Sequence, residues 1–176
     1  TYIQHFQLSY KQLRVLIINA LNIEDPLYKF GKGLEELYKK QLVNFEEKLF
    51  YKEPVDKNEY IKYLEEIQPT ILVFYGHGSF DYNEDEGKLH IRDDSITATE
   101  LEMIHWNPII TILGACETQT LNNNYLNIGN MLIGSGSASV LATYFPVDGM
   151  FTFSFLEGLF RHLLNTLRNE SPKRLI

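Results

Sequence analysis

Four short apolar blocks, rich in β-branched residues, constrain the fold of this chain more than any other feature of its sequence. They span residues 13–18, 70–75, 109–113 and 139–144. The first block is apolar on both faces, which is typical of a strand buried in a parallel sheet. Segments with helical periodicity separate the blocks. This alternation predicts an α/β fold with a mainly parallel central sheet and helices on both faces.

The segments between the blocks carry the start and stop signals of helices. One helix is expected after Pro26, with apolar residues at intervals of three and four. A second is expected to begin at the N-cap Asp56, with Glu59 in the capping-box position, and to end before Pro69. Further helices are predicted from Thr97 or Thr99 to 105, near 126–133 and, after a turn at 146–149, over 150–168.

Two regions are less regular. Residues 44–51 are compatible either with an extension of the first helix or with a short strand, and both alternatives stay open. Residues 81–86 form an acidic loop, and residues 87–92 alternate like one exposed strand. With neither an internal repeat nor a linker in the sequence, residues 1–176 are predicted to form a single domain.

Composition narrows the possible partners. Of the 176 residues 44% are hydrophobic and 22% charged, so the chain can bury a core without disulfides or metals. The formal charge of −7, without a basic block, argues against direct binding of nucleic acid or of an anionic membrane.

The sequence shows neither a membrane-spanning run nor a signal peptide. Together with the lone Cys116, this favours the cytoplasm. The start at Thr1 suggests a fragment of a longer protein.

Two reactive side chains follow two of the predicted strands. His77 comes directly after Tyr75-Gly76, and Cys116 comes two residues after the pair Leu113-Gly114 ends. If these strands are neighbours, their carboxyl ends lie about 5 Å apart, at the edge where parallel sheets bind ligands. A nearby imidazolium favours the thiolate form of a cysteine. The alternative is an inert cysteine in the core, which is the commoner role of a buried thiol.

Other candidate sites fail on their spacing. The acidic loop begins like a calcium-binding loop, but its glycine falls one place late and Arg92 stands at position twelve. Residues 134–137 lack the lysine of a phosphate-binding loop. The histidines show no spacing typical of metal ligands. We therefore expect neither a metal nor a cofactor.

The motifs around these residues resemble the CHAT domain, a caspase-like module of the clan CD cysteine peptidases. An apolar block leading into Gly-His-Gly precedes a second block leading into Ala-Cys-Glu-Thr. The matching segments lie between residues 71 and 164 and comprise 76–81, 89–91, 96–101, 112–118, 134–140 and 144–148.

The resemblance implies a caspase-like three-layer sandwich and an endopeptidase with a His77–Cys116 dyad. The backbone amides of Gly78 and Cys116 would form the oxyanion hole, and a third catalytic residue such as Asp81 is not required. The substrate groove would run past Gly114, Glu117, Tyr144 and Asp148. Since Gly114 carries no charge, a neutral residue before the cleaved bond is expected.

The resemblance also implies partners. They are a dedicated protein substrate, an upstream repeat or sensor region such as tetratricopeptide repeats, and an activating partner that relieves latency in bacterial defence or regulated cell death. Two alternatives remain, namely an inactive caspase-like scaffold and a separase-like or gingipain-like peptidase. Nucleotide binding is a more distant third, because the sequence has no phosphate-binding loop.

Overall fold

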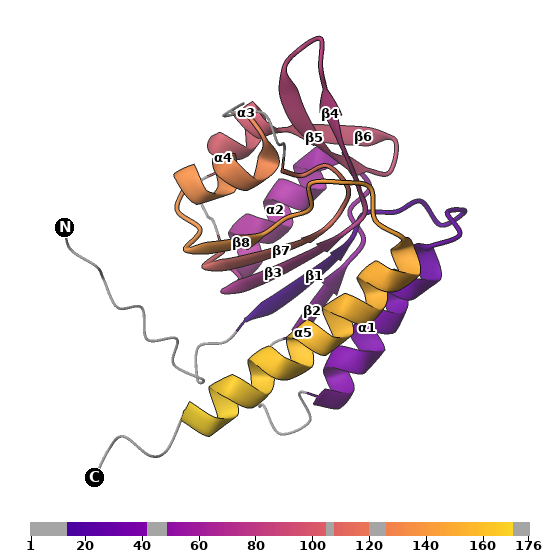
Figure 1. Ribbon diagram of the computed structural model, residues 1–176, viewed down its shortest axis with the longest axis vertical. Helices are drawn as coiled ribbons and strands as arrows, with labels where there is room; N and C mark the ends of the chain where they lie inside the picture. The colour runs from indigo at the N-terminus through magenta and orange to yellow at the C-terminus, as the bar shows by residue number, and fades with distance from the viewer. Residues whose placement is uncertain (1–13, 42–48, 105–107, 120–125, 171–176) are drawn as a thin grey trace, which may run out of the picture.

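A five-stranded sheet forms the centre of the domain in the computed structural model, which describes residues 14–41, 49–104, 108–119 and 126–170 (Figure 1). The strand order is β2-β1-β3-β7-β8, and all neighbours are parallel. The strands are β1 (Val15–Asn19), β2 (Leu49–Lys52), β3 (Ile71–Tyr75), β7 (Ile110–Gly114) and β8 (Ser139–Leu141). The predicted parallel α/β sheet is thus confirmed.

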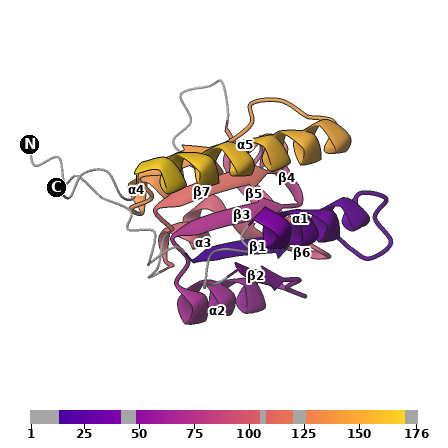
Figure 2. The same ribbon diagram turned by 90° about the horizontal axis from the view of Figure 1, so that it is seen from below.

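Helices cover both faces of this sheet (Figure 2). On one face lie α1 (Tyr28–Gln41) and α5 (Gly149–Glu170). On the other lie α2 (Lys57–Ile67), α3 (Ala98–Glu102) and α4 (Ile128–Gly134). The result is the three-layer sandwich that the sequence predicts.

The central strands supply both halves of the core. In β1, Val15 and Ile17 pack toward α1 and α5, whereas Leu16 and Ile18 pack toward α2 and the shorter helices. All five residues of β3 are buried as well. Because each buried aliphatic side chain contributes about 1.5–3 kcal/mol, these strands are stable only with apolar layers above and below.

Aromatic contacts join α1 to α5. The ring of Tyr38 stacks on that of Phe160 with a centroid separation of 3.5 Å, and both residues are fully buried. The Tyr38 hydroxyl donates a hydrogen bond to the Leu156 carbonyl at 3.2 Å. This bond satisfies the one polar atom that the buried ring carries.

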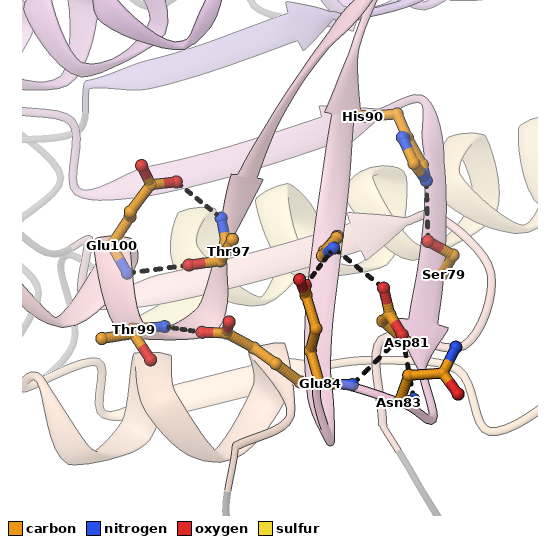
Figure 3. Close-up of polar contacts among 10 residues, drawn as sticks. Ser79, Asp81, Asn83, Glu84, His90, Thr97, Thr99 and Glu100 are labelled. Atoms are coloured by element: carbon orange, nitrogen blue, oxygen red, sulfur yellow. Dashed lines mark hydrogen bonds and ion pairs between the residues drawn. The ribbon is translucent and has the colours of Figure 1, made fainter.

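The predicted helix caps are present with one change of detail. Asp56 accepts a hydrogen bond from the Glu59 amide at 2.8 Å, but the Glu59 carboxylate accepts from the Val55 amide at the preceding turn. Thr97, not Thr99, caps α3 in a complete capping box with Glu100 (Figure 3).

The segment after β3 differs from the sequence prediction. The predicted strand at 87–92 is present as β5 (Glu86–Ile91), but it pairs with two strands that were not predicted, β4 (His77–Asp81) and β6 (Asp94–Thr97), in a separate antiparallel sheet. Buried side chains on one face of it, Leu89, Ile91 and Ile96, join the core beneath α3 and α4. That burial, which depends on neighbours distant in sequence, decides the structure of this segment.

The open alternatives for residues 44–51 are partly resolved. Residues 49–51 belong to β2, which pairs with β1 at the edge of the sheet. Residues 44–48 lie outside the described residues, as do Leu13 and His105, the predicted limits of a strand and a helix.

We expect Phe160→Ala to lower the free energy of unfolding by about 3–5 kcal/mol, because it leaves a cavity against Tyr38. Urea unfolding curves measure the loss. Phe155→Ala on the same helix is the matched control, since that ring is 44% exposed and its removal costs less than about 1 kcal/mol. Equal losses in the two variants would contradict the described core.

Stability should also depend on the ionisation of Glu100. Hydrogen bonds from the Lys57 ammonium at 2.6 Å and from the Thr97 amide hold the pKa of Glu100 below its ordinary value. A lowered pKa stabilises the fold above the unfolded value of about 4.3, and this stabilisation is lost as the pH falls through the folded value. The stability difference between the parent and Glu100→Gln should therefore shrink in urea titrations from pH 7 to about pH 3. A stability difference that does not change with pH would contradict this role of the Glu100 carboxylate.

Candidate active site

The carboxyl ends of β3 and β7 bring two segments together at one edge of the sheet. The strands are in register up to the pair Tyr75 and Gly114, and the Gly76 amide donates to the Gly114 carbonyl at 3.3 Å. His77 and Cys116 each follow this last pair by two residues. The neighbouring strands that the sequence analysis required are therefore present.

Gly78 packs tightly against the turn that carries the cysteine. A Cβ atom on Gly78 would collide with the carbonyl oxygen of Cys116, and it would lie 3.1 Å from a methyl of Thr118 and 3.4 Å from Ala115. Only a residue without a side chain fits this approach. The backbone at His77-Gly78 therefore lies directly on the turn formed by residues 115–118.

The thiol of Cys116 is half-buried and contacts the loop after β8. The Val147 amide donates to Sγ at 3.5 Å, and Sγ donates weakly to the Val147 carbonyl at 4.0 Å. Thr143 fixes the start of this loop, since its hydroxyl donates to the Ala115 carbonyl at 2.7 Å and its amide donates to the hydroxyl of Thr118 at 3.1 Å. The two loops are thus held together beside the thiol.

The imidazole of His77 has a partner that the sequence analysis missed. The side chain is 52% exposed, and its Nε2 lies 2.8 Å from Oδ2 of Asp25 in the loop between β1 and α1. Burial opposes ionisation of Asp25, but hydrogen bonds from His77 and the Leu27 amide outweigh it and lower the pKa of Asp25. The available signal was position: Asp25-Pro26 follows the carboxyl end of the first strand, at the same edge of the sheet.

A second histidine lies opposite His77 in the β4–β5 hairpin. His90 pairs with His77 across the strands, and its Nε2 lies 2.8 Å from the Ser79 hydroxyl (Figure 3). Burial, followed by the charges of His77 and Lys88, lowers the pKa of His90. His90 is consequently neutral near pH 7.

The acidic loop turns the hairpin. The Lys88 ammonium lies 3.0 Å from the Asp81 carboxylate and 2.6 Å from that of Glu84, while the other Asp81 oxygen accepts hydrogen bonds from the amides of Asn83 and Glu84 (Figure 3). The hydrogen bonds from Lys88 and these amides lower the pKa of Asp81. The Asp81 carboxylate, at the end of β4, is thus engaged at the hairpin turn.

The residues predicted for the substrate groove occupy different surroundings. Gly114 is buried, and a Cβ atom added there would lie 3.0 Å from Leu156 and 3.2 Å from Thr152 of α5. Asp148 caps α5, because its side chain accepts hydrogen bonds from the amides at positions 150 and 151. Tyr144 is 49% exposed, and Glu117 adopts a left-handed backbone with φ of 49° directly after the cysteine.

Among the described residues, no group of three or more His, Cys, Asp or Glu side chains could hold a metal ion. Within the same part of the chain, no helix is long and apolar enough to cross a membrane.

Comparison with solved structures finds a weak likeness. The signal receiver domain of a putative Luxo repressor protein from Vibrio parahaemolyticus is 15% identical, with 90% of this chain and 95% of that chain covered. The TM-score is 0.36, which is too low for the likeness to carry weight. Comparison with curated proteins gives no match.

Comparison with protein families gives a clear result. The model of the CHAT domain matches residues 31–173, which include β3, β7 and the loops that follow them. CHAT domains are related to the caspase-like cysteine peptidases, in line with the motifs around His77 and Cys116. Because the match spans well over half of the sequence, the chain belongs to the CHAT domain family.

Proposed function

We propose that this domain is a cysteine endopeptidase in which Cys116 is the nucleophile and His77 transfers the protons. The observation that carries the proposal is the register of β3 and β7, which places both residues two positions beyond one strand pair. The contact of Gly78 with the Cys116 carbonyl supports it, because it brings the two backbones together at the ligand-binding edge of the sheet.

The chemistry proceeds in two steps. The Cys116 thiolate attacks the carbonyl carbon of the peptide bond, and the electron pair of the C=O bond moves to the oxygen. The amides of Gly78 and Cys116 are the proposed donors to that oxyanion. When the C–N bond breaks, the imidazolium of His77 protonates the leaving amine. His77 then removes a proton from water, which attacks the thioester and releases the carboxylic acid and the thiolate.

The proposed substrate is a protein segment bound along the loop after β8. This loop contacts the thiol through Val147 and exposes Tyr144 and Phe145. Because Gly114 is buried under α5, Glu117 and Tyr144 are the residues that we propose to line the groove beside the nucleophile. By resemblance, the substrate is a dedicated protein, and an upstream repeat region with its activating partner controls cleavage in bacterial defence or regulated cell death.

One observation favours the alternative of an inactive scaffold. The hydrogen bonds that the structure describes for the Cys116 thiol go to the Val147 backbone and not to an imidazole. Such an arrangement also fits a latent peptidase whose loop must move before substrate binds. Chemical reactivity of the thiol separates an assembled dyad from a structural cysteine.

We predict that His77→Ala slows alkylation of Cys116 by iodoacetamide at least about tenfold near neutral pH, because an adjacent imidazolium favours the reactive thiolate. The rate is followed by mass spectrometry across about pH 5 to 9 in the parent and the variant. Since Cys116 is the only cysteine, no other thiol contributes to the signal.

His162→Ala is the matched control, because it removes an exposed imidazole from α5. It should leave the alkylation profile unchanged. The comparison is repeated in the full-length protein with its activating partner. If Cys116 is alkylated at the same rate in the parent and in His77→Ala there as well, the dyad is excluded and the inactive scaffold remains. If both His77→Ala and Cys116→Ala fail to cleave the cognate protein that the parent cleaves, the result would support the proposed peptidase.

Gly78→Ala should impair the site without unfolding the domain. Its Cβ would press on the Cys116 carbonyl, so we expect a stability loss of about 1–3 kcal/mol and slower alkylation. Gly158→Ala on α5 is the control, since nothing lies within 4 Å of its Cβ position and the change should stabilise the helix by about 1 kcal/mol. Denaturant curves and alkylation rates check both; an unaffected Gly78→Ala variant would contradict the described contact.

A further inference from the structure

We propose that Asp25 is a positioning residue that fixes the imidazole of His77 for its reaction with Cys116. The inference rests on the proposed peptidase function and adds a third member to the site. With Nε2 of His77 engaged by Asp25 at 2.8 Å, Nδ1 is the ring nitrogen left for the thiol and the substrate.

The carboxylate of Asp25 is itself held in place. One oxygen accepts the hydrogen bond from His77, and the other accepts from the Leu27 amide at 2.8 Å. The backbone of Asp25 is also engaged, because its amide donates to Asn22 and its carbonyl accepts from Tyr28. Only 19% of the Asp25 side chain is exposed, against 52% for His77. The fixed carboxylate can therefore orient the more exposed ring.

A partly buried polar cluster anchors this loop to the sheet. Asn19, fully buried at the end of β1, donates from Nδ2 to the Tyr28 carbonyl at 3.2 Å and to the Tyr51 hydroxyl at 2.9 Å. The hydroxyls of Tyr28 and Tyr51 both donate to the carboxylate of Glu53, at 2.6 and 2.8 Å. These hydrogen bonds thus connect the Asp25 loop to β1 and to β2.

The proton positions follow from the charges. Because the pKa of Asp25 is lowered, the group is a carboxylate near pH 7 and can only accept, so Nε2 of His77 donates. His90, which is neutral, lies across the hairpin from His77, while Tyr75 lies close enough to Asp25 and Asp148 to interact with them electrostatically. The contact that the structure describes for the His77 ring itself is the hydrogen bond with Asp25.

If Asp25 had only a structural role, its replacement would have small effects. Partly exposed polar pairs contribute little to stability, so loss of the Asp25–His77 contact should barely change the unfolding curve. Loss of orientation has a larger effect on reactivity, since a misplaced catalytic group can cost roughly a hundredfold in rate. Reactivity and stability therefore separate the two roles.

The test compares Asp25→Asn and Asp25→Glu with the parent. We expect Asp25→Asn, which keeps an acceptor for the Leu27 amide, to slow alkylation of Cys116 by about tenfold to a hundredfold with little change in the unfolding midpoint. Asp25→Glu restores the charge and should recover part of the rate. Asp56→Asn is the matched control, because Asn replaces Asp well at an N-cap and α2 begins outside the site.

Nitrogen-15 NMR of His77 supplies a readout that a structural role does not move. In the parent, the neutral ring should carry its proton on Nε2, and Asp25→Asn should lose this preference. A proton on Nδ1 in the parent would overturn the proposal even if the variants fail to fold. An alkylation profile unchanged in Asp25→Asn, with His77→Ala still slow, would also overturn it and leave the dyad intact. If His77→Ala has no effect, the proposed function itself fails.

Discussion

Strand β3 is covered on both faces and paired on both edges, and the rest of the structure depends on that burial. Its five residues, Ile71–Tyr75, are withdrawn from water, so two helical layers must enclose the sheet. Its backbone groups must also be hydrogen-bonded, since an unpaired buried amide or carbonyl is costly. The neighbours β1 and β7 supply these bonds. A strand confined in this way cannot shift in register, and the point at which it ends is therefore fixed in space.

The candidate site lies where this confinement ends. His77 and Cys116 stand on segments that leave the sheet at the same level, while Asp25 and Val147 approach from the loops after β1 and β8. Each approaching loop has its own anchor: the cluster around Asn19 holds one, and the paired threonines at positions 118 and 143 hold the other. The reactive groups are thus accessible in part, but the segments that carry them are attached to the core.

Much of this arrangement could be predicted from local patterns. The apolar blocks identified the strands of the central sheet apart from β2, the Asp56 cap identified the start of α2, and the motifs identified the family. The antiparallel sheet was predicted only in part, because residues 87–92 alternate like a strand but the short β4 and β6 that pair with them show no such pattern. Asp25 escaped prediction because an Asp-Pro pair after a strand is an ordinary turn unless a histidine from a distant segment lies beside it.

The sequence by itself determined the layered α/β architecture, since hydrophobic periodicity and helix caps act over a few neighbouring residues. It also determined which two side chains follow the central strands. Only the tertiary structure decided what those side chains meet: Asp25 at the imidazole of His77, and the backbone of Val147 at the thiol of Cys116. The first contact joins residues that are 52 positions apart in the sequence, and the second joins residues that are 31 positions apart. They depend on strand order and loop path, which follow from packing of the whole core and leave no periodic trace in the sequence.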